Sequence, residues 1–283
     1  MRNIWIIARM TFREAIRQRI VLTGLVLGLV FLTAFSFGFH EIYNNIQHRT
    51  DGIGEVYTNV LNNESIGFLS LAGLYAVTFL SAAMGALLGA DTLSGEIVSG
   101  TIQTIVTKPV RRSDVVLGKW LGFAILLALY SLLMSGGTVL SVRIQSGYTP
   151  RNILQGISLI YFESVLIMTI SIFCSSFLSG LATGGVVFGL YGLSFIGGWV
   201  EQIGAVLQNE TAVRVGIVTS LIIPSEALWR RAAFEMQSPL SAGLGISPFG
   251  TTSVPSPLMI GYAIIYLALA LMAAISTFNH RDL

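Results

Sequence analysis

The residues with the most ordered spacing lie in one polar stretch, Asp91–Lys119, which separates two long apolar runs. Its marked positions combine one acid with small residues, a proline and cations: Glu96, Gly100, Thr101, Pro109, Arg111, Arg112, Gly118 and Lys119. Connections between packed helices commonly take about two to eight residues, and this stretch is several times longer. We interpret it as a contact surface for a partner on one side of a membrane.

Sequence patterns for bond-making chemistry are missing. There is no GxxxxGK[ST] nucleotide loop, no HExxH zinc motif and no GxSxG nucleophile turn. The three histidines, His40, His48 and His280, are not spaced as a metal site on one helix. Cys174 is the only cysteine, which excludes an intramolecular disulfide and CxxC chemistry. We therefore expect a chain that is not itself an enzyme and that binds no cofactor.

The composition is that of a membrane protein. Hydrophobic residues make up 53% of the chain and charged residues 11%, where soluble domains carry about a quarter charged residues. Six apolar runs are long enough to cross a hydrocarbon core of about 30 Å as helices: Ile20–Phe39, Ile66–Ala90, Trp120–Val142, Ile153–Phe177, Leu181–Val200 and Leu258–Phe278. The predicted fold is an all-α membrane protein of six transmembrane helices, which form a single domain over residues 1–283.

Lysine and arginine in the connections indicate the orientation. With six spans, both termini lie on one side, and that side holds ten of the sixteen basic residues: Arg2, Arg9, Arg13, Arg17, Arg19, Lys108, Arg111, Arg112, Lys119 and Arg281. An excess of Lys and Arg near the span ends marks the cytoplasmic side, so we expect both termini and residues 91–119 in the cytoplasm. The net charge of +2 does not indicate a nucleic-acid partner.

Residues 1–19 predict an amphipathic helix at the membrane surface. At about 100° per residue, one face is basic and the opposite face is apolar. The basic face holds Arg2, Arg9, Arg13 and Arg17, and the apolar face holds Ile4, Ala8, Phe12 and Ala15, flanked by Trp5 and Ile16. Such a helix suits the headgroup layer of an anionic membrane. The alternative is a charged flank that only orients the first span. A cleavable signal peptide is not expected.

Two polar segments fall on the predicted outer side. His40–Ser65 has no strong periodicity, and Glu201–Pro257 contains AVRVGIVTSLIIP followed by SEALWRRAAFEM and a Pro/Gly/Ser-rich piece. Each of the two short runs is too short to span a membrane alone. We predict two short helices that lie on the outer leaflet or dip into it as a re-entrant pair. The alternative is a seventh, poorly formed span.

Small residues at four-residue spacing predict close helix packing. The pairs are Gly24/Gly28, Gly85/Gly89, Gly180/Gly184 and Gly185/Gly189, and such pairs let helix backbones approach closely in lipid. They indicate packing and not a particular function.

Glu163 is the one ionisable residue expected well inside a span. An intramembrane acid is a functional candidate, because leaving it unpaired there is costly. The structural interpretation is a packing residue near the outer surface, protonated or hydrogen-bonded, with Arg143 or Arg151 as a partner.

The pattern Glu96, Gly100-Thr101, Pro109, Arg112 and Gly118-Lys119 resembles the E-x-x-x-G-T … P-x-x-R … G-K signature of type-2 ATP-binding-cassette (ABC) exporter permeases. The basic N-terminal elbow helix, the six spans and the long outer segment match that family too. The resemblance therefore covers essentially the whole chain.

The resemblance implies a role for the polar stretch. Residues Glu96–Thr107 would form a coupling helix that docks into a cytoplasmic ATPase, and Pro109 would end it. Arg111 and Arg112 would face the ATPase or the lipid headgroups. Gly118-Lys119 would begin the third span, with Lys119 extending to the interface. ATP and magnesium would bind to the partner ATPase and not to this chain.

The resemblance also implies a substrate pathway along the second and fifth spans. The candidate lining is Tyr75 and Phe79 of the second span and Phe188 and Tyr191 of the fifth, with Glu163 of the fourth span as a further candidate. This lining suits a hydrophobic or amphipathic cargo. Six spans are few for a pathway, so we expect a second copy or a related permease, beside an ATPase dimer and membrane lipids. The expected location is a bacterial or archaeal cytoplasmic membrane.

Two other classes of protein stay open at this point. An ion-coupled secondary transporter or channel should show several polar residues within the spans, or an inverted repeat. A membrane assembly factor that transports nothing would need no coupling loop.

Overall fold

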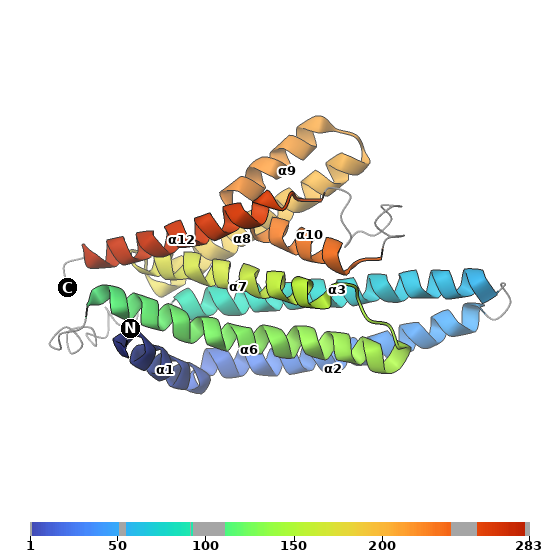
Figure 1. Ribbon diagram of the computed structural model, residues 1–283, viewed down its shortest axis with the longest axis horizontal. Helices are drawn as coiled ribbons and strands as arrows, with labels where there is room; N and C mark the ends of the chain where they lie inside the picture. Colours follow the sequence, from blue (N-terminus) through green and yellow to red (C-terminus); the bar gives the residue numbers. More distant parts are fainter. Residues whose placement is uncertain (1, 51–54, 91, 93–110, 239–253, 281–283) are drawn as a thin grey trace.

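The six predicted spans are all helices. The computed structural model describes residues 2–50, 55–90, 92, 111–238 and 254–280, and these contain helices and connections but no strand. The long helices are α2 (Arg19–Thr50), α3 (Glu55–Ala90), α6 (Arg112–Ser146), α7 (Ile153–Ser175), α8 (Gly180–Val206) and α12 (Leu258–Asn279) (Figure 1). Each contains a stretch long and apolar enough to cross a membrane. The predicted fold class is therefore confirmed.

Helices α2 and α3 are longer than a bilayer requires. They contain 32 and 36 residues, which corresponds to about 48 Å and 54 Å at 1.5 Å per residue, against a hydrocarbon core of about 30 Å. The polar segment His40–Ser65, which showed no strong periodicity, is therefore mostly helical, because both spans continue into it. In Figure 1 both helices extend past the end of α6.

Helix α7 is the centre of the bundle. It packs against α3, α6, α8, α10 and α12, and most of its residues are buried. Met168 and Ile172 of α7 join Leu127 of α6 and Val77 of α3 in the largest apolar cluster. By contrast, only 11% of the residues in the apolar stretch of α2 are buried, and the same share is buried in α12. These two helices therefore lie at the margin of the bundle.

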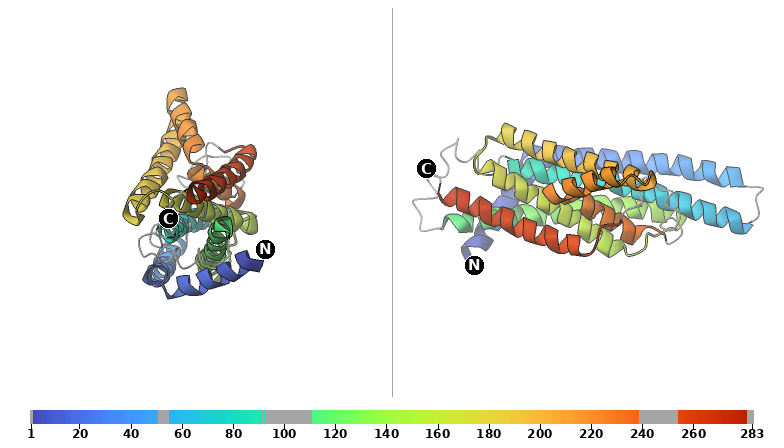
Figure 2. Two further views of the ribbon diagram at one scale, coloured as in Figure 1. Left: turned by 90° about the vertical axis from the view of Figure 1, so that its left-hand side faces the viewer. Right: turned by 90° about the horizontal axis from the view of Figure 1, so that it is seen from above.

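One end of the bundle gathers several chain segments, and we call it the termini end. It holds α1 (Arg2–Arg17), the last turn of α3, the first turn of α6 and the last turn of α12 (Figure 1). Helix α1 packs against α6 and lies on the side of the bundle opposite the α8–α9 pair (Figure 2).

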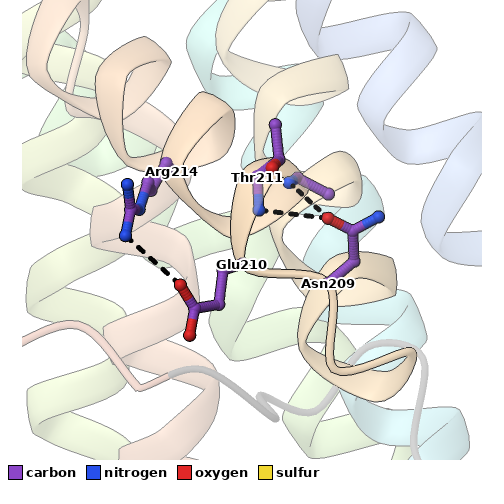
Figure 3. A network of polar contacts seen from close by, with 5 residues as sticks. Asn209, Glu210, Thr211 and Arg214 are labelled. Atoms are coloured by element: carbon purple, nitrogen blue, oxygen red, sulfur yellow. Dashed lines mark hydrogen bonds and ion pairs between the residues drawn. The ribbon is translucent and has the colours of Figure 1, made fainter.

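Two short helices follow α8, as predicted: α9 (Glu210–Ile222) and α10 (Ser225–Met236). They meet at an angle of 107° across Ile223 and Pro224, so they form either a re-entrant pair or one bent additional span. Helix α9 folds back along α8, and its first turn is capped by Asn209, whose Oδ1 accepts hydrogen bonds from the backbone N–H groups of Thr211 and Ala212 (Figure 3). Helix α10 packs against α7, α8 and α3.

The glycine pairs divide into two groups. A Cβ on Gly85 would lie 2.6 Å from the carbonyl oxygen of Ser164, and one on Gly89 would lie 2.4 Å from the Ser171 Cβ, so α3 approaches α7 closely at both. Gly24 and Gly28 also face close neighbours, on α3 and α6. On α8, however, Gly184 and Gly189 have no described atom within 4 Å of a built Cβ. The packing expected at those α8 glycines is absent from the described part of this chain.

Candidate functional site

The predicted contact surface is described only at its two edges. Glu96, Gly100, Thr101 and Pro109, with the segment Glu96–Thr107, lie outside the described residues. Thr92, at the end of α3, is one edge, and Arg111 to Lys119, at the start of α6, form the other. The geometry of these edges shows which helices a force on the connection would reach.

Arg112 connects the start of α6 to the end of α12. Its Nη1 atom lies 3.4 Å from the carbonyl oxygen of Phe278 and 3.3 Å from that of Asn279, and it donates to both. The last carbonyls of a helix have no partner within the helix and carry its negative dipole end, so a guanidinium there is favourable. Arg111, immediately before α6, has an exposed side chain.

Lys119 connects α6 to the end of α3. Its side chain is 9% exposed, and its Nζ atom donates a 2.9 Å hydrogen bond to the carbonyl oxygen of Thr92. Lys119 was expected to extend to the lipid interface at the start of a span. In the structure α6 begins earlier, at Arg112, and the ammonium group of Lys119 bonds to a backbone carbonyl just beyond the end of α3.

Gly118 brings α1 against α6. A Cβ built on Gly118 would lie 2.7 Å from the Cβ of Ile7, and one on Gly122 would lie 2.7 Å from the carbonyl oxygen of Ala8. Both distances are too short for a side chain, so glycine is required for this close approach. The Gly118-Lys119 pair thus has a physical role: the glycine seats α1 on one side of α6, and the lysine holds α3 on another.

The face of α1 that packs on α6 is the predicted apolar face. Ala8 and Ala15 are 1% and 0% exposed, and Phe12 is partly buried. Arg9, Arg13 and Arg17 are exposed, as are two apolar side chains beside the packed face, Trp5 at 61% and Ile16 at 49%. The small residues therefore pack against protein, and the aromatic and aliphatic residues at the flanks are available to lipid.

A groove of about 680 Å³ runs between α2, α3 and α8. Its lining is almost wholly apolar and includes three of the predicted pathway residues, Tyr75, Phe79 and Tyr191, together with Phe195. The rings of Tyr75 and Phe195 lie 6.1 Å apart and those of Phe79 and Tyr191 lie 5.9 Å apart, so aromatic pairs join α3 to α8 along it. Phe188 and Glu163, also predicted for the pathway, do not line this groove.

Tyr75 connects the groove to a buried polar cluster. Its hydroxyl donates to the Glu226 Oε1 atom on α10 at 3.3 Å and accepts from the Trp199 Nε1 atom on α8 at 3.3 Å. The backbone N–H of Glu226 donates to the Ser194 hydroxyl on α8 at 3.2 Å. A side chain of the groove wall is thereby joined to the first turn of α10.

Arg230 and Glu201 form a buried ion pair in the same cluster. Their nearest N and O atoms lie 2.6 Å apart, and their side chains are 2% and 5% exposed. Arg230 also donates to the Ser220 hydroxyl at 3.2 Å. This pair joins α10 to α8.

Glu163, on α7, is fully buried, and neither of its carboxyl oxygens has a hydrogen-bond partner in the described part of the chain. The expected pairing with Arg143 or Arg151 is therefore wrong. Two further acids that the sequence did not single out are also buried in the protein: Glu201 and Glu226 are 4% and 3% exposed. Sequence reasoning placed both acids in an outer segment, because the apolar run of α8 was ended at Val200, one residue before Glu201, and because α10, which carries Glu226, is short and polar.

Comparison with known proteins covers nearly the whole chain. Residues 5–283 match the family model described as ABC-2 family transporter protein. A probable ABC transporter permease protein NosY from Stutzerimonas stutzeri is 26% identical over 147 residues, which is 50% of this chain. A protein of the same name from Pseudomonas aeruginosa is 27% identical over 144 residues, 49% of this chain. The matched stretch spans less than half of these relatives, 46% and 45% of their lengths.

Proposed function

This chain belongs to the ABC-2 family of transporter proteins, and we propose that it is the membrane subunit of an exporter driven by a separate pair of ATPase subunits. In this proposal ATP and magnesium bind to the partner, and this chain converts the partner's movement into a change at the groove. The cargo is a hydrophobic or amphipathic molecule.

One observation carries the coupling part of the proposal: both edges of the 93–110 connection are joined to other spans. Lys119 holds the end of α3 at Thr92, and Arg112 holds the end of α12. A partner that pushes on the connection would therefore move α3, α6 and α12 together. We place the docking segment at Glu96–Thr107, followed by Pro109, as the family signature implies.

The groove supports the choice of cargo. Its wall on α3 carries Tyr75 and Phe79, and α3 is the helix whose end is held by Lys119. A displacement of α3 would thus change the spacing between the aromatic pairs that join α3 to α8. An apolar lining with few polar groups favours a hydrophobic or amphipathic ligand over an ion or a sugar.

The same face supports a second copy of this chain, or a related permease, as a partner. The groove is bounded by α2, which is mostly exposed, and by α8, in whose apolar stretch 28% of the residues are buried. Gly184 and Gly189 of α8 have open space around them, and small residues in membrane helices favour close helix contact. A second permease on this face would close the groove into a pathway between subunits.

The basic residues support the orientation. Arg9, Arg13, Arg17 and Arg111 are exposed at the termini end, where an excess of cations favours the cytoplasmic side of a membrane. We propose that this end faces the cytoplasm of a bacterial or archaeal cell, with α1 as an elbow helix in the anionic headgroup layer. The far end, with the α2–α3 connection, would then face outward.

Purification from native membranes tests the proposal. Affinity-tagged protein should bring with it an ATP hydrolysis activity, and Gly100→Trp, which places a large side chain in the proposed docking segment, should abolish that activity while the protein still inserts. Glu210→Gln is the matched control, because Glu210 is exposed on α9 and its ion pair among the described residues is with the neighbouring Arg214. If no hydrolysis co-purifies, or if Gly100→Trp retains all of it, the proposed coupling is wrong.

A further inference from the structure

A second groove, of about 300 Å³, lies between α2 and α3 toward the termini end of the bundle, with Tyr130 contributed by α6. It meets the larger groove described above, because Leu27 of α2 and Leu80 of α3 line both. The two grooves therefore form one continuous depression along α2 and α3.

The lining of the second groove is charged at one end only. Arg19, in the first turn of α2, is the one charged side chain among its described lining residues. Arg19 is exposed, and the ion pairs of the described residues do not include it. The two hydroxyl groups of the lining are bonded within the protein: Thr23 donates to the Arg19 carbonyl at 2.8 Å, and Tyr130 donates to the Gly24 carbonyl at 3.3 Å. A free guanidinium at the end of an apolar groove suits a molecule with a negative head and an apolar tail.

The residues around Arg19 are also basic. Residues 1–20 contain five arginines and one acid, Glu14. Arg13 and Arg17 are exposed near the end of α1, which finishes two residues before Arg19. A second copy of this chain, rotated about the membrane normal, would bring its own basic end to the same level, where like charges repel. An anionic lipid headgroup is instead attracted to such a cluster.

The length of the groove matches that of a lipid chain. Leu27 follows Arg19 by about 12 Å along α2 at 1.5 Å per residue. Ala34, which lines the larger groove, follows Arg19 by about 22 Å on the same basis. One leaflet supplies about 15 Å of hydrocarbon. A chain whose headgroup is at Arg19 would therefore fill the second groove and reach the start of the larger one.

The second groove is closed toward the protein and open toward the lipid. A Cβ built on Gly24 would lie 2.8 Å from the Met84 sulfur, so α2 and α3 touch at that point. Leu27 and Leu87, which also line the groove, are 55% and 40% exposed. A lipid chain could thus enter from the bilayer without any helix moving.

We propose that the second groove binds one acyl chain of an anionic phospholipid, whose phosphate is held by the Arg19 guanidinium. The end of the chain lies at Leu27 and Leu80, so the lipid closes the termini end of the larger groove. The inference concerns the membrane domain alone and depends neither on an ATPase nor on a transported cargo.

Tryptophan quenching by brominated phospholipids tests this proposal in the full chain in bilayers. The reporter is Leu87→Trp, in the groove. The control is Leu129→Trp on α6, where the leucine is 55% exposed and is not among the residues that line either groove. Each bilayer is mostly zwitterionic phosphatidylcholine with a minor share of anionic phosphatidylglycerol, and one of the two carries bromine on its chains. The signal of the unmodified chain, which has four tryptophans, is subtracted.

We expect Leu87→Trp to report an affinity for phosphatidylglycerol about fivefold above that for phosphatidylcholine, which is the contribution of about one cation at an anionic surface. Leu129→Trp should be quenched in proportion to the share of each lipid. Equal affinity for the two lipids at Leu87→Trp means ordinary lipid contact only and overturns the proposal. Weaker quenching of Leu87→Trp than of Leu129→Trp by both lipids means that protein covers the groove, as a second copy would, and overturns it too.

A substitution at Arg19 separates a headgroup site from general attraction to the basic end. Arg19→Gln, combined with Leu87→Trp, should remove the preference for phosphatidylglycerol. Arg9→Gln removes the same charge from an exposed position on α1 that does not line the groove, and it should leave the preference intact. A preference that survives Arg19→Gln, or that both variants reduce equally, refutes a phosphate site at Arg19.

Discussion

The termini end and the buried acid cluster, which consists of Glu163, Glu201, Glu226 and Arg230, differ in how their charged side chains are paired. At the termini end, Lys119 and Arg112 each donate to terminal backbone carbonyls, at Thr92 and at Phe278. In the cluster, Arg230 forms an ion pair with Glu201. The carboxyl oxygens of Glu163 have no hydrogen-bond donor among the described residues. In the first arrangement, cations bond to backbone carbonyls at the end of α12 and just beyond the end of α3, where the helix supplies no donor. The second buries three acids, Glu163, Glu201 and Glu226, and one cation, Arg230, among the described residues.

The two regions also differ in how far apart in the sequence their contacting residues lie. Thr92 and Lys119 flank one connection, so their contact closes a local unit. Glu163, Glu201 and Arg230 come from three helices that meet only after the bundle has formed. We therefore expect changes in the cluster to affect the whole fold, and changes at the termini end to act on the connection that they flank.

The largest effect is expected from Arg230→Met, which would leave Glu201 buried without its cation. Breaking one partner of a buried ion pair costs about 3–5 kcal/mol, so the variant should show a much lower thermal midpoint in detergent or little folded protein. The double variant Arg230→Met with Glu201→Gln removes the orphaned charge and should recover part of the loss. A midpoint equal to wild type in the single variant would mean that the ion pair is not needed, and the contrast between the two regions would fail.

A smaller effect is expected from Lys119→Met, which removes the donor to the Thr92 carbonyl while keeping the apolar stem. An unsatisfied buried backbone acceptor costs about 1–3 kcal/mol, and the end of α3 should become more accessible to hydrogen exchange. Arg111→Gln, in an exposed side chain next to the same helix start, is the matched control and should change stability by about 0.5 kcal/mol or less. Equal exchange at residues 86–90 in both variants would show that Lys119 does not hold α3.

The smallest effect is expected from Gly118→Ala, compared with Gly136→Ala on the same helix. Alanine favours a helix over glycine by about 1 kcal/mol, and Gly136 has open space around it, so its variant should be slightly more stable. At Gly118 the new methyl group would meet Ile7, and overpacking of about 1–3 kcal/mol should exceed that gain. Thermal midpoints and protease cleavage after α1 report the two effects. If both variants are equally stabilised, α1 is not seated on Gly118.

Local signals predicted most of the fold. Apolar runs of about twenty residues marked all six spans, and the short runs either side of Pro224 marked α9 and α10. The ends were less predictable, because α2 and α3 continue as helices into polar sequence that has no apolar face to display a period. Of the pathway residues, Tyr75, Phe79 and Tyr191 meet at the groove, while Phe188 and Glu163 do not line it. Sharing a span did not determine which face of the helix each residue occupies.

The sequence alone determined the membrane class, the number of long helices and the family signature, because these depend on composition and on spacing within short windows. Only the tertiary structure decided the partners of the charged residues. Lys119 stands at the edge of an apolar run, where a lysine is expected at the membrane interface. Its side chain instead bonds to the Thr92 carbonyl, just beyond the end of α3. Glu163 was expected to pair with Arg143 or Arg151, yet neither of its carboxyl oxygens has a hydrogen-bond partner in the described part of the chain. Pairing of charges depends on which helices meet, and that is decided by packing across the whole bundle.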